Sequence, residues 1–278
     1  MKKTFGVIGG DGRQAKLATL LREDGAIVHT YGVEGEKGDL EQALDAEVIL
    51  LPLPLCKEDG LLNCKEDPMV LAELFARLTP RQRILAGQVK PQQQAEVAQY
   101  GLILEDYFLR EELTVANAAA TAECALRVAM EQLDRSLLGE NILVLGFGRI
   151  GKLLCHRLQG LGCRVTATAR KNADLAWIRA YGYEALKTDE GDLAPFGVVF
   201  NTIPALVLDR ARLAQLPPGS LCVDLASKNG IDPGAAKELG LSYIWARFLP
   251  GRMVPHTAAA AIRETIYHIL SEERGESL

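Results

Sequence analysis

The sequence lacks the features of a secreted, membrane-spanning or nucleic-acid-binding protein. No apolar run in its 278 residues approaches the length that spans a bilayer. The apolar part of the N-terminus is too short for a signal peptide and continues directly into a strand and turn pattern. Lys and Arg (31) are fewer than Asp and Glu (36), which argues against a surface for nucleic acid or anionic lipid. We therefore expect a cytosolic protein that binds neither nucleic acid nor membrane.

The six cysteines lack the spacing of a metal or redox site. Cys56 and Cys64 are eight residues apart, as are Cys155 and Cys163, and neither pair has the close spacing of a CxxC motif. Free cysteines in a reducing compartment are usually buried as small hydrophobic residues. We predict neither a metal site nor a catalytic thiol.

The first half of the chain alternates short apolar runs with helical patterns. Such alternation predicts βαβ units and a parallel sheet. The run at 48–51 is continuously apolar and is followed by Pro52 and Pro54, as in a central strand buried on both faces. The expected strands are 4–8, 26–31, 48–51, 83–86 and 102–104, and the expected helices are 13–24, 70–78 and 92–100.

A second βα series follows a long stretch with helical character and no Gly or Pro between Val115 and Leu138. Its expected strands are 141–145, 163–169, 198–203, 221–225 and 241–246, and its helices are 150–161, 175–181 and 257–271. We predict an α/β protein of two Rossmann-like parallel-sheet domains joined by a long helix, the C-terminal helix packing back on the first domain. The predicted parts are a flavodoxin- or Rossmann-like substrate domain (1–115), a linking helix (116–138), an NAD(P)-binding domain (139–255), and a C-terminal helix and tail (256–278).

A GxGxxG motif carries the clearest functional signal. It follows the apolar strand at 142–145 and begins an amphipathic helix, which is the context that dinucleotide binding requires. Gly146 would make the tight turn, Gly148 would let the backbone approach a diphosphate, and Gly151 would let helix and strand pack closely. The first helical N–H groups, at Arg149 and Ile150, would face the anion. The motif predicts a nicotinamide dinucleotide cofactor and hence an oxidoreductase.

The end of the second strand of this domain favours NADP over NAD. An NAD enzyme usually has Asp or Glu there, against the adenosine ribose. This chain has Arg170 and Lys171, which would pair with a 2′-phosphate. Alternatively Arg170 is only a solvated charge, and NAD is accepted as well.

Two further strand ends are expected at the same carboxyl edge, where open α/β sheets bind ligands. Thr202 and Pro204 are predicted to line the nicotinamide side of the cofactor. After the next strand, the polar groups of 224–228 are expected to face the cleft between the domains, with Ala226 and Ser227 at the cofactor. For Asp224, capping of a turn is the alternative.

A second glycine turn, Gly9 to Gly12, lies at the start of the first domain. It lacks the GxGxxG spacing and has Asp11 where a diphosphate would lie. We predict instead that it recognises substrate, with Arg13 holding a carboxylate. The alternative is a helix cap at Asp11 with Arg13 in solvent.

Motifs across the whole chain, taken in order, resemble the dipicolinate synthase A subunits, dehydrogenase-like proteins of endospore-forming bacteria. The two that discriminate against other dehydrogenases lie in the first domain and the long helix. The motifs are Gly9-Gly10-Asp11-x-Arg13-Gln14, Asn117-x-x-x-Thr121-x-Glu123, Gly146-x-Gly148-Arg149-x-Gly151, Asn201-Thr202-Ile203-Pro204, Asp224-Leu225-Ala226-Ser227 and Leu249-Pro250-Gly251-x-x-x-Pro255-x-Thr257-Ala258.

The resemblance implies a reaction, a partner and a setting. With a flavoprotein-like B subunit, such an enzyme would oxidise a dihydrodipicolinate-type ring to pyridine-2,6-dicarboxylate in the mother-cell cytoplasm during sporulation. The substrate is then a small dicarboxylate, for which Arg13, Gln14, Asn117 and Thr121 are the predicted binding residues. Asn117 and Thr121 are one helical turn apart and would face the same way.

Aromatisation removes one hydride and one proton, so the site needs geometry more than a strong base. His256 and Glu123 are the candidate proton acceptors, the first by its intrinsic pKa. Glu123 could instead tie the domains together. Lys228, or the helix N-terminus near Thr257, could hold the second carboxylate, and Lys228 is counted with the catalytic candidates.

Two other functions stay open at this point. The chain could be a two-domain dehydrogenase of the hydroxyacid type, since Arg247 and His256 are present, although no Glu is correctly placed between them. It could also be a non-catalytic dinucleotide-binding subunit. A homo-oligomer is a further alternative that stays open here.

Overall fold

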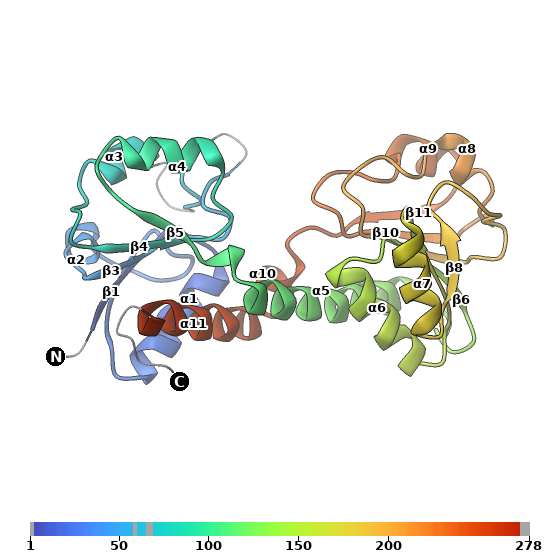
Figure 1. Ribbon diagram of the computed structural model, residues 1–278, viewed down its shortest axis with the longest axis horizontal. Coiled ribbons are helices and arrows are strands. Elements are labelled where there is room, and N and C mark those ends of the chain that lie inside the picture. Colours follow the sequence, from blue (N-terminus) through green and yellow to red (C-terminus); the bar gives the residue numbers. More distant parts are fainter. Residues whose placement is uncertain (1–2, 58–59, 65–68, 273–278) are drawn as a thin grey trace. The chain divides into compact units, whose positions relative to one another are not determined.

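The computed structural model describes residues 3–57, 60–64 and 69–272 and divides into two compact units (Figure 1). Unit 1 comprises residues 1–117 and 250–278, and unit 2 comprises 118–249. Each unit is built on a sheet whose strands are all parallel. The predicted α/β class with two parallel-sheet domains is confirmed.

The unit 1 sheet has the order β2-β1-β3-β4-β5. Its strands are β1 (Thr4–Ile8), β2 (Ile27–Tyr31), β3 (Val48–Leu50), β4 (Arg83–Ala86) and β5 (Leu104–Asp106). The helices are α1 (Gly12–Glu23), α2 (Leu40–Leu44), α3 (Leu71–Phe75), α4 (Pro91–Ala98) and α11 (Pro255–Glu272), with a 3₁₀ turn, η1 (Tyr107–Leu109). The order of the strands reverses between β1 and β3.

Helices cover both faces of this sheet (Figure 1). One hydrophobic cluster joins the sheet to α2, α3 and α4, and a second joins it to α1 and α11. β3 is buried throughout, because neighbouring strands and helices surround it on all sides. The apolar face of α11, with Ile262 and Ile266 fully buried, packs against α1. The predicted return of the C-terminal helix to the first unit is therefore confirmed.

The unit 2 sheet has the order β11-β10-β9-β6-β7-β8, that of a Rossmann fold, with the reversal between β6 and β9. Its strands are β6 (Asn141–Leu145), β7 (Arg164–Ala169), β8 (Glu184–Lys187), β9 (Val198–Asn201), β10 (Leu221–Asp224) and β11 (Ser242–Trp245). The helices are α6 (Arg149–Gly160), α7 (Asn172–Ala180), α8 (Arg210–Leu213) and α9 (Pro233–Glu238). Two helices cross between the units, α5 (Glu111–Gln132) and α10 (Leu249–Met253).

The long helix differs from its predicted range of 116–138, since α5 begins at Glu111 and ends at Gln132. Short polar side chains that follow its end, Asp134 and Ser136, compete for backbone hydrogen bonds and disfavour further helix. The Leu138 N–H, for example, donates to the Ser136 hydroxyl at 3.2 Å. Gly139 belongs to the turn that leads into β6, with φ of +77°, rather than to the end of the helix.

Among the residues that the structure describes, no helix combines the length and the apolar character that crossing a membrane requires. The same residues contain no cluster of three or more His, Cys, Asp or Glu side chains that could hold a metal ion. All six cysteines are buried free thiols, as expected of small hydrophobic residues. Burial raises the pKa of Cys155 and Cys222 to about 12, so both stay protonated near neutral pH.

Candidate functional site

The GxGxxG loop connects β6 to α6 beside the point where the strand order of unit 2 reverses. β6 ends at Leu145, Gly146 takes a φ of +95°, and α6 begins at Arg149 with Gly148 as its N-cap. Gly148 has no side chain to cap the helix, so the first N–H groups of α6 receive no side-chain acceptor from this position. Such N–H groups form an anion site at a helix N-terminus.

The three glycines of the loop differ in what a side chain at each position would meet. A Cβ on Gly151 would lie 2.2 Å from the Gly146 carbonyl oxygen, so α6 can pack this closely only with glycine there. A Cβ on Gly146 would lie 2.5 Å from the Thr202 Oγ1. A Cβ on Gly148 would meet no protein atom within 4 Å, so this position faces open space. The loop therefore fits a diphosphate, which needs close backbone approach at Gly148.

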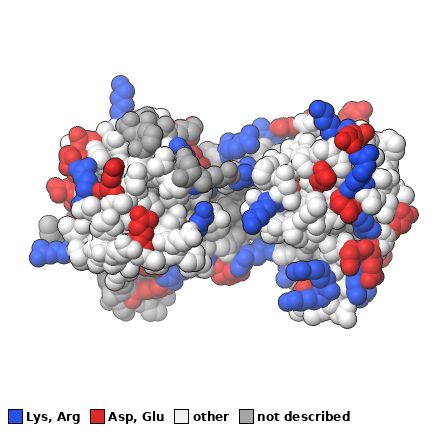
Figure 2. Space-filling model, turned by 90° about the horizontal axis from the view of Figure 1, so that it is seen from above, with Lys and Arg blue, Asp and Glu red and all other residues white. Residues whose placement is uncertain are grey.

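Arg170 directly follows β7, and Lys171 is the N-cap of α7. Both side chains are exposed, and neither forms an ion pair with a described residue. On the face shown in Figure 2, basic and acidic side chains are mixed over the surface of each unit. Arg170 and Lys171 thus keep their charges available to solvent or to an anion.

The ends of β9 and β10 are held by hydrogen bonds within the protein. Asn201 donates to the Asp224 carboxylate at 2.8 Å, and this fully buried carboxylate also accepts N–H groups of Ala226 and Gly230 at 3.1 and 2.8 Å. The expectation that Asp224 faces a ligand is wrong, because its carboxylate is used to fold the loop that follows β10. Capping of the turn, the alternative, is correct.

The other predicted cofactor residues of these strand ends differ in exposure. Thr202 is half-buried and Pro204 exposed. Ala226 is buried and accepts the indole N–H of Trp245 at 3.0 Å. Ser227 and Lys228 are exposed at the same edge. Their side chains remain accessible for a ligand.

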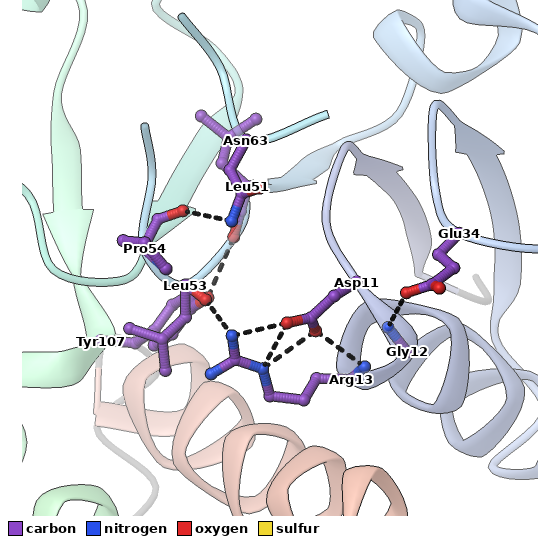
Figure 3. Close-up of polar contacts among 9 residues, drawn as sticks. All are labelled: Asp11, Gly12, Arg13, Glu34, Leu51, Leu53, Pro54, Asn63 and Tyr107. Atoms are coloured by element: carbon purple, nitrogen blue, oxygen red, sulfur yellow. Dashed lines mark hydrogen bonds and ion pairs between the residues drawn. The ribbon is translucent and has the colours of Figure 1, made fainter. Parts of the chain in front are cut away.

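In unit 1, Arg13 is bound within the turn that follows β1 (Figure 3). Its Nε donates to Asp11 Oδ1 at 2.9 Å, and its Nη2 donates to Asp11 Oδ2 at 2.8 Å and to the Leu53 carbonyl. The arginine side chain is 6% exposed and that of Asp11 28%. Asp11 caps α1 as well, by accepting the Arg13 N–H at 3.0 Å. Arg13 therefore does not lie in solvent, and one edge of its guanidinium joins the turn to the segment after β3.

Gly251, at the start of the C-terminal segment, lies against this ion pair. A Cβ there would be 2.7 Å from Arg13 Nε and 2.9 Å from Asp11 Oδ2. The sequence motif around Gly251 did not indicate this contact, because its partner lies more than two hundred residues away in the chain. Glu34, which accepts the Gly12 N–H at 3.1 Å, was likewise not predicted.

Gln14 is 1% exposed, and neither atom of its amide has a hydrogen-bond partner of good geometry. Its side chain covers Gly10, where a Cβ would lie 2.5 Å from Gln14 Cγ. The amide is near the Tyr107 hydroxyl, whose proton goes to the Leu51 carbonyl at 3.0 Å. Burial raises the pKa of Tyr107 above its usual range, and the phenol stays neutral. Gln14 keeps hydrogen-bonding capacity that the turn does not use.

The predicted residues of the long helix lie on α5, with Asn117 half-buried and Thr121 buried. Glu123 is exposed and forms an ion pair with Arg157 of α6 at 2.9 Å. This pair joins two helices of unit 2. His256 is exposed at the second residue of α11.

Comparison with known proteins identifies relatives of both units. The family model for the N-terminal domain of the dipicolinate synthase A subunit matches residues 4–108. The dipicolinate synthase A subunit of Bacillus subtilis is 27% identical over 97% of this chain and 96% of its own. The resemblance to the dipicolinate synthase A family is confirmed.

Solved structures extend the likeness to three dimensions. The crystal structure of the dipicolinate synthase A subunit from Bacillus halodurans gives a TM-score of 0.85 at 26% identity, covering 97% of this chain and 98% of that chain. The corresponding protein of Bacillus subtilis gives 0.84 at 27%, covering 100% and 98%. D-lactate dehydrogenase of Escherichia coli shares the fold at 13% identity, with a TM-score of 0.63 and 98% coverage of both chains. Together with the loop geometry, these likenesses support a dinucleotide-binding subunit with a dehydrogenase-like fold.

Because Arg13 is buried, we expect Asp11→Asn to leave its charge without a full partner and to lower the free energy of unfolding by about 3 kcal/mol. Arg13→Met should cost less, since Asp11 is partly exposed, and the double variant should cost less than the sum of the two. Urea unfolding measures all three. Glu131→Gln is the control, because the Arg127–Glu131 pair is exposed on both sides and should change stability by about 0.5 kcal/mol or less. A cost for Asp11→Asn no larger than that of the control would contradict the structural role.

Proposed function

We propose that the chain is an NAD(P)-dependent oxidoreductase subunit that forms dipicolinate from a dihydrodipicolinate-type precursor. The main support is the loop at Gly146–Gly151, in which Gly148 faces open space. The chain that contains this loop is similar over its length to dipicolinate synthase A subunits. The relatives' name supplies the product, and the loop supplies the cofactor class. The B subunit of dipicolinate synthase is the proposed partner, and the mother-cell cytoplasm of a sporulating bacterium is the proposed setting.

The dinucleotide, when bound, would accept the hydride that leaves the dihydropyridine ring. For this cofactor the chain offers the glycine loop and the first N–H groups of α6 to the diphosphate. Arg170 and Lys171, exposed after β7, would pair with a 2′-phosphate and make NADP the preferred form. The exposed ends of β9 and β10, at Pro204 and Ser227, would contact the remainder of the cofactor.

The substrate's carboxylates need fixed donors. In unit 1, Arg13 Nη1 has no partner among the described residues, while the opposite edge of the guanidinium is held by Asp11 and Leu53. Gln14 has a buried amide without a partner of good geometry. We propose that these two groups bind one carboxylate, with Asn117 and Thr121 of α5 also contacting the ring, and that Lys228 binds the second carboxylate.

Removal of the proton needs an acceptor near neutral pH. Glu123 is already bound to Arg157, which holds its carboxylate on the surface of unit 2. His256 is exposed on the first turn of α11, and imidazole is the side chain that most often acts as a general base in enzymes. We therefore favour His256 over Glu123 as the proton acceptor.

The reaction can be tested by co-expressing the chain with a dipicolinate synthase B subunit, supplying dihydrodipicolinate and following the absorbance of NADPH and of the pyridine product. We expect both to form together. Gly148→Ala should lower the rate at least about tenfold, because a Cβ would obstruct the diphosphate, with little change in thermal stability. No product from the pair would contradict the proposed reaction. Dinucleotide binding without product would instead indicate a non-catalytic subunit.

The cofactor preference can be tested by measuring KM for NADP and NAD side by side. We expect the wild-type chain to prefer NADP and Arg170→Ala to raise KM for NADP about tenfold, through the loss of charge-assisted hydrogen bonds. KM for NAD should change little. The control is Arg164→Ala, an exposed arginine at the opposite, amino end of the same strand. A wild-type preference for NAD would exclude the proposed role of Arg170.

The role of Gln14 can be separated from a structural one. Gln14→Met removes a buried amide that has no hydrogen bond of good geometry, so we expect the free energy of unfolding to rise by about 1 kcal/mol while KM for the substrate increases. Gln93→Met is the matched control: Gln93 is also buried, but its amide accepts the Lys90 N–H at 2.8 Å, so that change should destabilise. Lower stability and an unchanged KM in Gln14→Met would show that the amide serves the fold.

A further inference from the structure

The peptide unit between Leu145 and Gly146 is held at both ends by threonine hydroxyls. Its carbonyl, on Leu145, accepts the Thr202 hydroxyl at 2.9 Å and the Thr202 N–H at 2.9 Å. Its N–H, on Gly146, donates to the Thr168 hydroxyl at 3.3 Å. No other acceptor for this N–H exists among the described residues. The unit where the glycine loop leaves the sheet thus has little freedom to rotate.

Thr168 lies on β7 and Thr202 directly follows β9, and these are the strands on either side of β6. In the sheet register Leu145 pairs with Thr168 of β7 and with Asn201 of β9, the residue before Thr202. β6 ends at Leu145, so the next N–H has no strand partner on the β7 side, and the Thr168 hydroxyl takes the place of a carbonyl. Thr168 is 2% exposed, and it also accepts the Thr188 hydroxyl at 3.3 Å. A buried chain of hydroxyls therefore continues the sheet beyond the end of β6.

This arrangement fixes the conformation at the start of the loop. Gly146 turns at a φ of +95°, a value that side-chain-bearing residues rarely adopt. The Thr202 hydroxyl lies only 2.5 Å from the position that a Cβ on Gly146 would take, so this hydroxyl can approach the loop only because residue 146 is glycine. The next residue, Phe147, is buried with its ring 6.0 and 6.3 Å from those of Tyr181 and Tyr183. The loop reaches Gly148 already ordered, and a ligand need not provide that order.

We propose that Thr168 is a positioning residue for the dinucleotide, acting with Thr202 on the Leu145–Gly146 peptide. The inference rests on the proposed dinucleotide binding and adds the residues that determine its strength. It also changes the interpretation of Thr202. Its hydroxyl proton is given to Leu145, so Thr202 acts by holding the loop rather than by donating to the nicotinamide.

The test measures the dissociation constant of NADPH by fluorescence titration of the whole chain. Thr168→Val keeps the shape and removes the hydroxyl, leaving the Gly146 N–H without an acceptor. We expect binding to weaken about tenfold, and Thr168→Ser to restore it to near the wild-type value. Thr202→Val should weaken binding less, about threefold, because Leu145 keeps the Thr202 N–H. Thr166→Val is the matched control, since Thr166 is buried two residues earlier on β7 and pairs with Leu143 rather than with Leu145.

A kinetic measurement separates positioning from general loss of structure. In the complex with the B subunit, Thr168→Val should raise KM for the dinucleotide while KM for the dihydropyridine stays as in the wild type. If Thr168→Val does not fold, Thr188→Val and Thr202→Val test the inference in its place. We expect each of them to bind NADPH about threefold more weakly than the wild type.

Equal NADPH affinity in the wild type, Thr168→Val and Thr202→Val would overturn the inference and leave the proposed function standing. Failure of serine to restore binding would also overturn it, because the hydroxyl would then not be the active group. A wild-type chain that binds neither NADPH nor NADH would overturn the proposed function and this inference together.

Discussion

The carboxyl edge of a parallel sheet leaves peptide groups without a further strand to pair with, and the structure of both units depends on how these groups are satisfied. In unit 1, Arg13 donates to the Leu53 carbonyl, and Asn63 to that of Pro54 at 3.2 Å. In unit 2, hydroxyls and the buried Asp224 perform the same task. Several polar side chains at these edges therefore bind the backbone, and a ligand must bind to the others.

The N-terminus of α1, which follows β1, and that of α6, which follows β6, differ in the acceptors that their N–H groups already have. α1 begins with the Asp11 carboxylate as its cap, and Glu34 accepts the Gly12 N–H. Two carboxylates thus already neutralise the positive end of that helix. The N-cap of α6 is Gly148, which has no side chain. Two glycine turns at equivalent places consequently have opposite preferences for anions, and only the second suits a diphosphate.

The sequence was most informative where one local pattern determines the structure. Continuous apolar runs predicted β3 and β6, and the glycine spacing predicted the loop. The pattern failed for β8, Glu184–Lys187, an edge strand whose side chains are exposed or half-buried and so give no apolar signal. It also failed for Asp224 and for the contacts of Thr168 and Gly251. A sequence shows that a polar residue follows a strand, but its side chain can turn toward solvent or back to the sheet. That choice depends on peptide groups contributed by distant segments.

In each of these turns one positive-φ glycine is covered by the side chain of a later residue. Thr202 lies over Gly146 and Gln14 over Gly10, each with an atom 2.5 Å from the place of the missing Cβ. Thr202, which is half-buried, donates its hydroxyl proton to the Leu145 carbonyl, whereas the fully enclosed Gln14 amide has neither atom in a well-formed hydrogen bond. An enclosed amide without a well-formed hydrogen bond is costly to keep, by about 1–3 kcal/mol. If the fold alone determined position 14, an apolar residue of the same size would suit it better, and this cost is the physical argument for assigning Gln14 to a ligand.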